Sequence, residues 1–181
     1  MNLAGLLLKS RGWKFDLNVQ LPPKCIICVA PHTSNWDFIL GELCIRSKGL
    51  KSGFLMKDTW FFFPLGFLLK KIGGVPVAQH RRTNVSATVT ESFNSHAQLA
   101  VAVTPEGTRS LNPKWHKGFL YIAKEANVPI VLAYVDYPKR YVCIDCVFHT
   151  TGDIEADLIS IKKYYKEHGC ARFPEKFSTG I

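Results

Sequence analysis

A chain of 181 residues with 47% hydrophobic and 20% charged residues has the composition of one globular domain, which excludes an intrinsically disordered protein. Its net charge of +9 indicates an anionic partner, such as a phosphorylated small molecule, nucleic acid or an acidic membrane surface. No run approaches the roughly 20 apolar residues of a membrane-spanning helix, and the N-terminal MNLAGLLLKSR is not typical of a signal peptide. Without internal repeats or linkers, residues 1–181 are expected to form a single domain.

The six cysteines include two Cys-x-x-Cys pairs, a spacing that can bind zinc. Cys25 and Cys28, like Cys143 and Cys146, lie inside apolar runs rich in β-branched residues. Residues i and i+3 of a strand point to opposite faces, so one metal ion cannot readily bind both thiols. We therefore expect reduced cysteines that pack as small apolar side chains, which suits a reducing cytoplasmic compartment.

In chain order, the first predicted strand is the apolar run CIICVA (25–30), typical of a strand buried on both faces of a sheet. A helix is predicted directly after it, because Ser34 can cap its N-terminus and Asp37, three residues later, completes a capping box. The next helix is indicated by an apolar i+4 stripe, formed by Val85, Val89, Phe93 and Ala97.

LAVAVT (99–104) and PIVLAYVD (129–136) are two further predicted strands. The helix between them is indicated by a stripe of Phe119, Ile122, Ala123 and Ala126. A short turn leads into YVCIDCVF (141–148), which we expect to pair antiparallel with the preceding strand. The last helix is indicated by Ile154, Leu158, Ile161 and Tyr165. Alternating strands and helices predict an α/β fold with a mixed, mostly parallel sheet flanked by helices.

Polar segments follow two of the predicted strands, and parallel strands would bring them to one edge of the sheet. The first is PHTSNWDF (31–38), with His32 and Asp37. A neutral imidazole can remove a hydroxyl proton, and a carboxylate on its other nitrogen fixes the tautomer and stabilises the imidazolium. The alternative is an ordinary histidine beside a helix-capping aspartate.

The second polar segment, PEGTRS (105–110), has the features of an anion-binding loop. Gly107 lets the backbone approach a ligand, and Arg109 carries a planar guanidinium suited to phosphate. Glu106 cannot bind phosphate itself, so we expect it to pair with an arginine or to accept a hydrogen bond from a substrate hydroxyl. The alternative is an ordinary turn with an exposed arginine.

With both segments in view, the chain resembles the glycerolipid acyltransferases, the 1-acylglycerol-3-phosphate and glycerol-3-phosphate O-acyltransferases. Four family blocks occur in the expected order over roughly residues 25–135. They are His32 to Asp37 as the His-x-x-x-x-Asp block, Gly73–Val77, Pro105–Ser110 with the following 114–119, and Val128–Val131. The ordered set is far more specific than any one block.

The resemblance implies a glycerol-3-phosphate acyltransferase-like fold and a direct transfer mechanism without metal or other cofactor. His32, held by Asp37, would deprotonate an acceptor hydroxyl that attacks the thioester of acyl-CoA or acyl carrier protein. The segment of Glu106, Gly107, Thr108 and Arg109 would bind the acceptor and its phosphate.

One departure from the family pattern concerns the acceptor. The family usually has Asp-Arg just after the second block, where this chain has Ala78 and Gln79. Either Arg81 or Arg82 could supply the missing guanidinium, or the acceptor could lack a glycerol phosphate; alternatively both arginines are solvated charges before a helix. A smaller departure is Leu132, where a second proline is common.

The most apolar stretch, Trp60–Leu69, is followed by Lys70 and Lys71. Aromatic residues beside lysines suit contact with the surface of an anionic membrane, although a core segment between sheet and helix would have a similar sequence. Since family substrates are lipids, the resemblance implies a cytoplasmic enzyme bound peripherally to the inner face of the membrane.

The leading hypothesis is therefore an O-acyltransferase of phospholipid synthesis that acts on 1-acylglycerol-3-phosphate. A second hypothesis is acyl transfer to another lyso-lipid, such as a lyso-amino-acid lipid, supported only by Gln79. A third is a basic binding protein without chemistry. The chain has no recognisable nucleic-acid-binding module, so nucleic acid is not an expected partner.

Overall fold

The computed structural model describes residues 2–50, 53–71, 73–77 and 85–181. The strands are β1 (Lys14–Leu17), β2 (Lys24–Ala30), β3 (Gly53–Lys57), β4 (Gly74–Val77), β5 (Leu99–Val103), β6 (Ile130–Asp136) and β7 (Tyr141–Phe148). The helices are α1 (Leu3–Ser10), α2 (Asn35–Ser47), α3 (Leu65–Lys71), α4 (Val85–Ser95), α5 (Gly118–Ala126) and α6 (Ile154–Glu167), with short 3-10 turns at Asp58–Trp60 and Pro174–Lys176.

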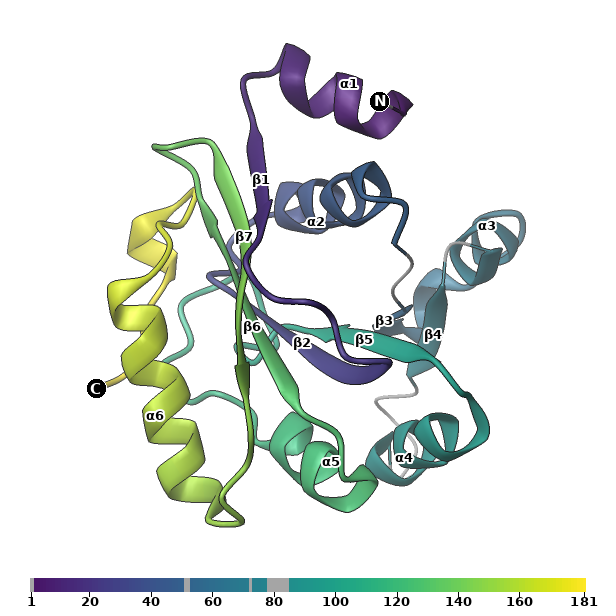
Figure 1. Ribbon diagram of the computed structural model, residues 1–181, viewed down its shortest axis with the longest axis vertical. Coiled ribbons are helices and arrows are strands. Elements are labelled where there is room, and N and C mark those ends of the chain that lie inside the picture. Colours follow the sequence, from purple (N-terminus) through teal and green to yellow (C-terminus); the bar gives the residue numbers. More distant parts are fainter. Residues whose placement is uncertain (1, 51–52, 72, 78–84) are drawn as a thin grey trace.

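The strands form one seven-stranded sheet in the order β1-β7-β6-β2-β5-β3-β4 (Figure 1). Every neighbouring pair is parallel except β6 and β7, which are joined by a short turn and run antiparallel. The predicted α/β fold with a mixed, mostly parallel sheet is confirmed, as is the antiparallel pair.

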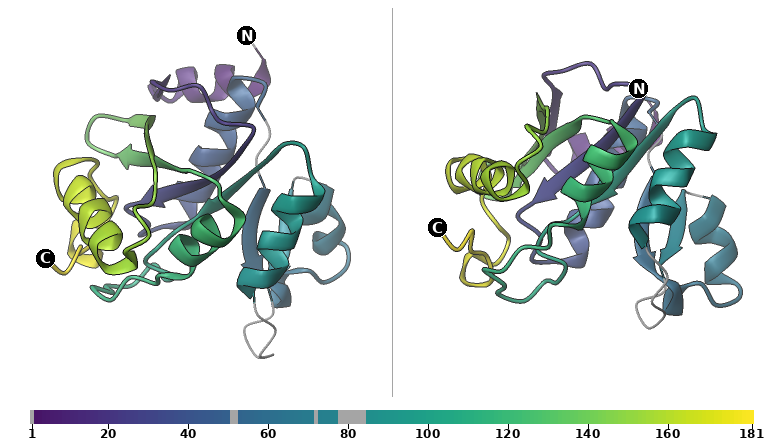
Figure 2. Two further views of the ribbon diagram at one scale, coloured as in Figure 1. Left: turned by 60° about the horizontal axis from the view of Figure 1, so that its bottom comes forward. Right: turned by 90° about the horizontal axis from the view of Figure 1, so that it is seen from below.

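Strand β2 lies near the middle of the sheet and is buried on both faces, as predicted for an uninterrupted apolar run. Ile26, Cys28 and Ala30 pack on one face, against α4, α5 and α6. Cys25 and Ile27 pack on the other, the side covered by α1 and α2. Figure 2 shows the resulting layers of helix, sheet and helix.

The cysteines are free thiols, as expected. Cys25 and Cys28 belong to apolar clusters on opposite faces of the sheet, which follows from the alternation of side chains along a strand. Burial raises the pKa of both thiols to about 12, so they stay protonated at neutral pH. These thiols contribute to the core as small apolar groups.

The predicted helices are all present, with one boundary placed differently. Helix α4 ends at Ser95, so Ala97 is exposed beyond the helix and does not extend its apolar stripe. Elements without a clear pattern were not predicted: α1, β1, β3, α3 and β4. Strands β1 and β4 have only four residues each, and their stability comes from pairing: β1 with the distant β7, and β4 with β3, the preceding strand in the chain. None of the described helices has the length and apolarity to cross a membrane.

Strands β2 and β5 are parallel neighbours, with Lys24 opposite Leu99 and Cys28 opposite Val103. The segments that leave their carboxyl ends, 31–38 and 104–110, therefore begin at the same edge of the sheet. This adjacency is what the parallel arrangement predicted, and it brings the two polar segments together.

Candidate active site

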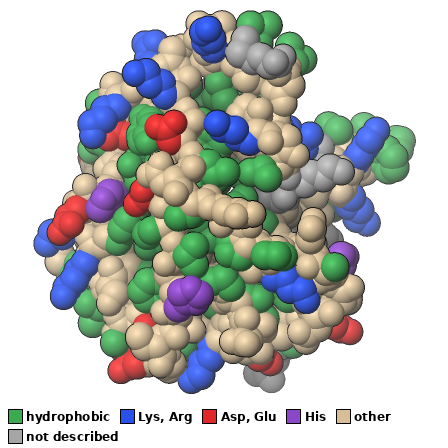
Figure 3. Space-filling view, in the orientation of Figure 1, with side chains coloured by type: hydrophobic (Ala, Val, Ile, Leu, Met, Phe, Trp, Pro, Cys, Tyr) green, Lys and Arg blue, Asp and Glu red, His purple; other side chains and the backbone are tan. Residues whose placement is uncertain are grey.

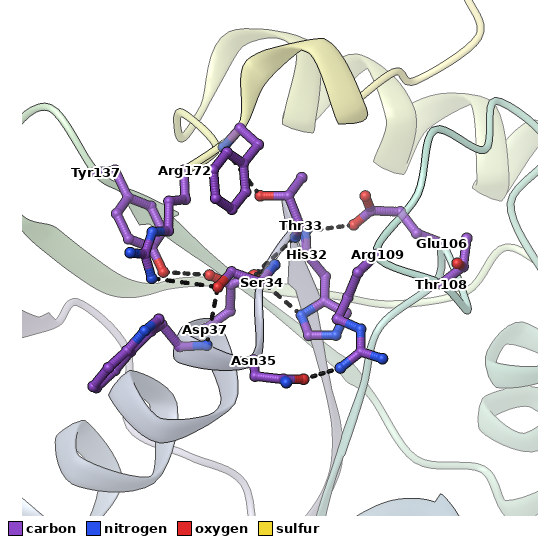
Figure 4. Close-up of polar contacts among 12 residues, drawn as sticks. His32, Thr33, Ser34, Asn35, Asp37, Glu106, Thr108, Arg109, Tyr137 and Arg172 are labelled. Carbon is purple, nitrogen blue, oxygen red and sulfur yellow. Dashed lines mark hydrogen bonds and ion pairs between the residues drawn. The ribbon is translucent and has the colours of Figure 1, made fainter.

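The loop after β2 turns directly into α2, and Asp37 occupies the third helical position. Its Oδ2 accepts hydrogen bonds from the backbone N–H groups of Thr33 at 2.8 Å and Ser34 at 2.9 Å. The same oxygen lies 3.2 Å from Nδ1 of His32 (Figure 4). The capping role and the contact with histidine are thus served by one carboxylate, and the two interpretations of Asp37 are compatible.

The two side chains differ in their access to solvent. The imidazole of His32 is 18% exposed, whereas the carboxylate of Asp37 is 2% exposed. Burial alone would raise the pKa of Asp37, but hydrogen bonds from His32, Tyr137 and the Ser34 backbone outweigh it and hold the pKa below its usual value. Asp37 is therefore a carboxylate at neutral pH, and Nε2 of His32 is the ring nitrogen left for other contacts.

Glu106 lies behind the loop instead of facing an acceptor. Its side chain is 2% exposed, and its Oε1 accepts a hydrogen bond from the backbone N–H of His32 at 2.7 Å. Among the described residues, no arginine forms an ion pair with Glu106. A substrate hydroxyl would need access to this carboxylate, which its burial denies.

The environment of Glu106 favours its neutral form. Its pKa is raised to about 8: burial is the largest cause, the nearby negative charge of Asp37 also raises it, and the hydrogen bond from the His32 backbone partly opposes them. Because Glu106 bonds to the backbone of His32, it supports the segment that carries the imidazole.

Arg109 reaches across the edge of the sheet to the start of α2. Its Nη1 donates a hydrogen bond to Oδ1 of Asn35, which places the exposed guanidinium beside His32 (Figure 4). Thr108 accepts a hydrogen bond from the Ser110 backbone at 3.2 Å, which closes the turn. The structure therefore brings Arg109, but not the carboxylate of Glu106, to the open side of the loop.

Gly107 is the residue that permits this turn. Its φ is +67°, a conformation that L side chains rarely adopt. A β-carbon there would also lie 2.3 Å from Cδ2 of His116, so the imidazole of His116 packs against the position where a side chain would start. The close approach of backbone and ring explains why this position requires glycine.

Two residues near Asp37 were missed by the sequence interpretation. Tyr137, in the turn between β6 and β7, donates a hydrogen bond from Oη to Oδ1 of Asp37 at 2.5 Å. Arg172 lies over the rings of Trp36 and Phe173, with Nη1 3.5 Å from Oγ of Ser34. No local pattern could have identified either, because both come from segments far from the loop in sequence.

Of the other predicted site residues, Arg81 and Arg82 lie outside the described residues, as do Ala78 and Gln79. Within the described ranges, no three histidine, cysteine or acidic side chains gather closely enough to suggest a metal site.

Comparisons with known proteins identify the family and the fold. A family model described as Acyltransferase matches residues 16–135. The crystal structure of the 1-acyl-sn-glycerophosphate acyltransferase PlsC from Thermotoga maritima is similar in fold, with a TM-score of 0.61 and 16% sequence identity. The match covers 91% of this chain and 76% of that one. No curated protein matches the chain significantly.

Proposed function

Because the chain belongs to the acyltransferase family, we propose that it transfers a fatty acyl group from acyl-CoA or acyl carrier protein to the hydroxyl of a lyso-lipid. The favoured acceptor is 1-acylglycerol-3-phosphate. The observation that carries the proposal is the contact between the buried Asp37 carboxylate and Nδ1 of the partly exposed His32. This arrangement leaves Nε2 of a neutral imidazole free to act as a general base.

In the proposed reaction, Nε2 of His32 takes the proton of the acceptor hydroxyl as its oxygen attacks the thioester carbonyl. The new C–O bond forms, the C–S bond breaks, and the leaving thiolate receives the proton from His32. Asp37 stabilises the transient imidazolium and keeps the proton of the neutral ring on Nδ1. The reaction draws on no resident cofactor, since both substrates bring the reacting groups.

For the acceptor phosphate, we propose Arg109 as the principal contact. Its guanidinium is exposed beside His32, and its bond to Asn35 holds it there while leaving other N–H donors for phosphate. In the same proposal, the turn of Gly107 and Thr108 contributes backbone to this side of the site. Arg81 or Arg82 would supply the second cation that the family usually carries at the position of Gln79.

An exposed apolar surface supports attachment to a membrane. The surface around α3 carries Trp60, Phe62, Phe63, Phe67 and Leu68, and Figure 3 shows hydrophobic side chains gathered there and over α1. Phe63 is 91% exposed, so it does not belong to a core segment between sheet and helix. Gly66 and Leu69 of the same stretch are buried, as a core segment would require. We propose that this surface contacts the inner face of the cytoplasmic membrane.

The double variant Phe63→Ser, Phe67→Ser is expected to bind anionic vesicles more weakly, by about tenfold or more, because it lacks the two rings that would be buried in the membrane interface. Co-sedimentation with vesicles of mixed anionic and zwitterionic lipid measures the effect. Ile159→Ser removes an exposed apolar side chain from α6 and should leave binding unchanged. Equal binding by the double variant and the parent would contradict the membrane proposal for this surface.

The function is tested by acyl transfer from both donors to a panel of lyso-lipids in vesicles, with His32→Ala as the control. Transfer to lysophosphatidate that the variant lacks would support the proposal. Transfer only to an acceptor without phosphate, such as a lyso-amino-acid lipid, would support the proposed acyl transfer but show that the proposed acceptor is wrong. A folded protein that transfers to none of them, and whose vesicle binding collapses with moderate salt, would instead be a basic binding protein.

A further inference from the structure

We propose that Tyr137 is a positioning residue for His32, acting through a hydrogen bond that holds Asp37 in place. This inference rests on the proposed function, in which His32 is the general base. Tyr137 lies outside the family-matched range of residues 16–135, in the turn that joins β6 to β7.

The two oxygens of Asp37 have different partners. Oδ2 receives the backbone N–H groups of Thr33 and Ser34 and faces Nδ1 of His32. Oδ1 receives Oη of Tyr137 at 2.5 Å, from the opposite side of the carboxylate (Figure 4). The hydrogen bonds to both oxygens restrict rotation of the Asp37 carboxylate about its Cβ–Cγ bond. That rotation sets the orientation of Oδ2 toward Nδ1 of His32.

The position of the Tyr137 hydroxyl is fixed by contacts of its ring and its backbone. Its ring packs edge-on against Trp13, with the ring centroids 5.3 Å apart. Its backbone N–H donates to the carbonyl of Cys170 at 3.0 Å. Burial and the negative charge of Asp37 raise the pKa of Tyr137, so the phenol keeps its proton and remains a donor. A rigid donor costs little conformational entropy when it orients the carboxylate.

The other charged groups around Asp37 come from three separate segments. His32 lies in the same loop, and Glu106 approaches from the segment after β5. Arg172 lies beside Tyr137 and Ser34 on the C-terminal segment. Tyr137→Phe leaves these groups in place and removes one hydroxyl, which makes it a specific probe of the bond to Asp37.

Without the tyrosine donor, the Asp37 carboxylate keeps its backbone bonds on Oδ2 but is less restrained in rotation, and it is less neutralised. We expect Tyr137→Phe to lower kcat about tenfold with little change in the acceptor KM, because a less well oriented carboxylate holds the imidazole less often in the position that takes the acceptor proton. The acidic limb of the pH–rate profile should move to higher pH, because a less neutralised Asp37 attracts the imidazolium more strongly. Tyr121→Phe, at an exposed tyrosine of α5, is the matched control.

A second readout does not depend on acyl transfer. The imidazole NMR signals of His32, assigned by their loss in His32→Ala, should titrate at higher pH in Tyr137→Phe than in the parent. If the parent transfers no acyl group but the His32 titration still moves to higher pH in Tyr137→Phe, the proposed function fails. The link from Tyr137 to His32 through Asp37 is then still supported. Unchanged kcat, pH profile and His32 titration in a folded Tyr137→Phe protein would overturn the inference.

Discussion

Asp37→Asn is expected to lower kcat by about a thousandfold while the acceptor KM changes little, because an amide cannot stabilise the imidazolium of His32. The side-chain carbonyl of asparagine can still accept the backbone N–H bonds of Thr33 and Ser34, so the start of α2 should persist. The amide N–H groups would also compete for Nδ1 and favour the wrong tautomer of the base. Steady-state kinetics with the preferred donor and acceptor measures the loss.

A matched control exists at the start of α6. Asp153 caps that helix by accepting hydrogen bonds from the backbone N–H groups of Glu155 and Ala156, and it lies far from His32 in the chain. Asp153→Asn makes the same chemical change at a purely capping aspartate and should leave kcat unaltered. If Asp37→Asn retained more than about a tenth of the parental kcat, capping would be sufficient to explain Asp37, and its proposed role beside His32 would be wrong.

Glu106→Gln is expected to change the way that stability depends on pH. The folded-state pKa of Glu106, about 8, lies above the ordinary value of 4.5, so the folded protein binds this proton more tightly than the unfolded chain. The resulting stabilisation is fully present below about pH 4.5 and is lost as pH rises through about 8. The difference across that range is on the order of 5 kcal/mol.

Glutamine can still accept the N–H bond of His32 but does not titrate. The free energy of unfolding of the parent should therefore fall, relative to Glu106→Gln, as pH is raised from 5 to 9. Urea unfolding at a series of pH values measures this difference, and titrations common to both proteins cancel. Glu125→Gln, at an exposed position of α5, should track the parent. A flat difference between parent and Glu106→Gln would show that Glu106 is ionised throughout.

The His32–Asp37 site could be anticipated because its signals are local. The spacing that makes Ser34 and Asp37 a capping box also places the carboxylate over the preceding loop, where His32 lies. The parallel pairing of β2 and β5, inferred from alternating strands and helices, then brings Arg109 to the same edge. Both steps depend on backbone geometry within a few residues or on a general rule of sheet topology.

Glu106 illustrates the opposite case. An acidic residue in a polar turn has no local signal for burial, and we expected it to face an arginine or a substrate. Its burial follows from the packing of the segment after β5 against the loop after β2, where the backbone N–H of His32 needs an acceptor. The aromatic segment around Phe63 raised the same difficulty, because sequence alone could not distinguish a core segment from an exposed surface.

The amino-acid sequence by itself determined the strands with continuous apolar runs, the helices with apolar stripes, the cap of α2 and the candidate base with its carboxylate. Each of these features depends on residues close together in the sequence, because side-chain periodicity and local backbone hydrogen bonds determine it. Only the tertiary structure decided that Tyr137, a hundred residues from Asp37, completes the carboxylate's hydrogen bonding. That contact depends on which strands become neighbours and on how tightly the turn between β6 and β7 packs, and both are properties of the whole sheet.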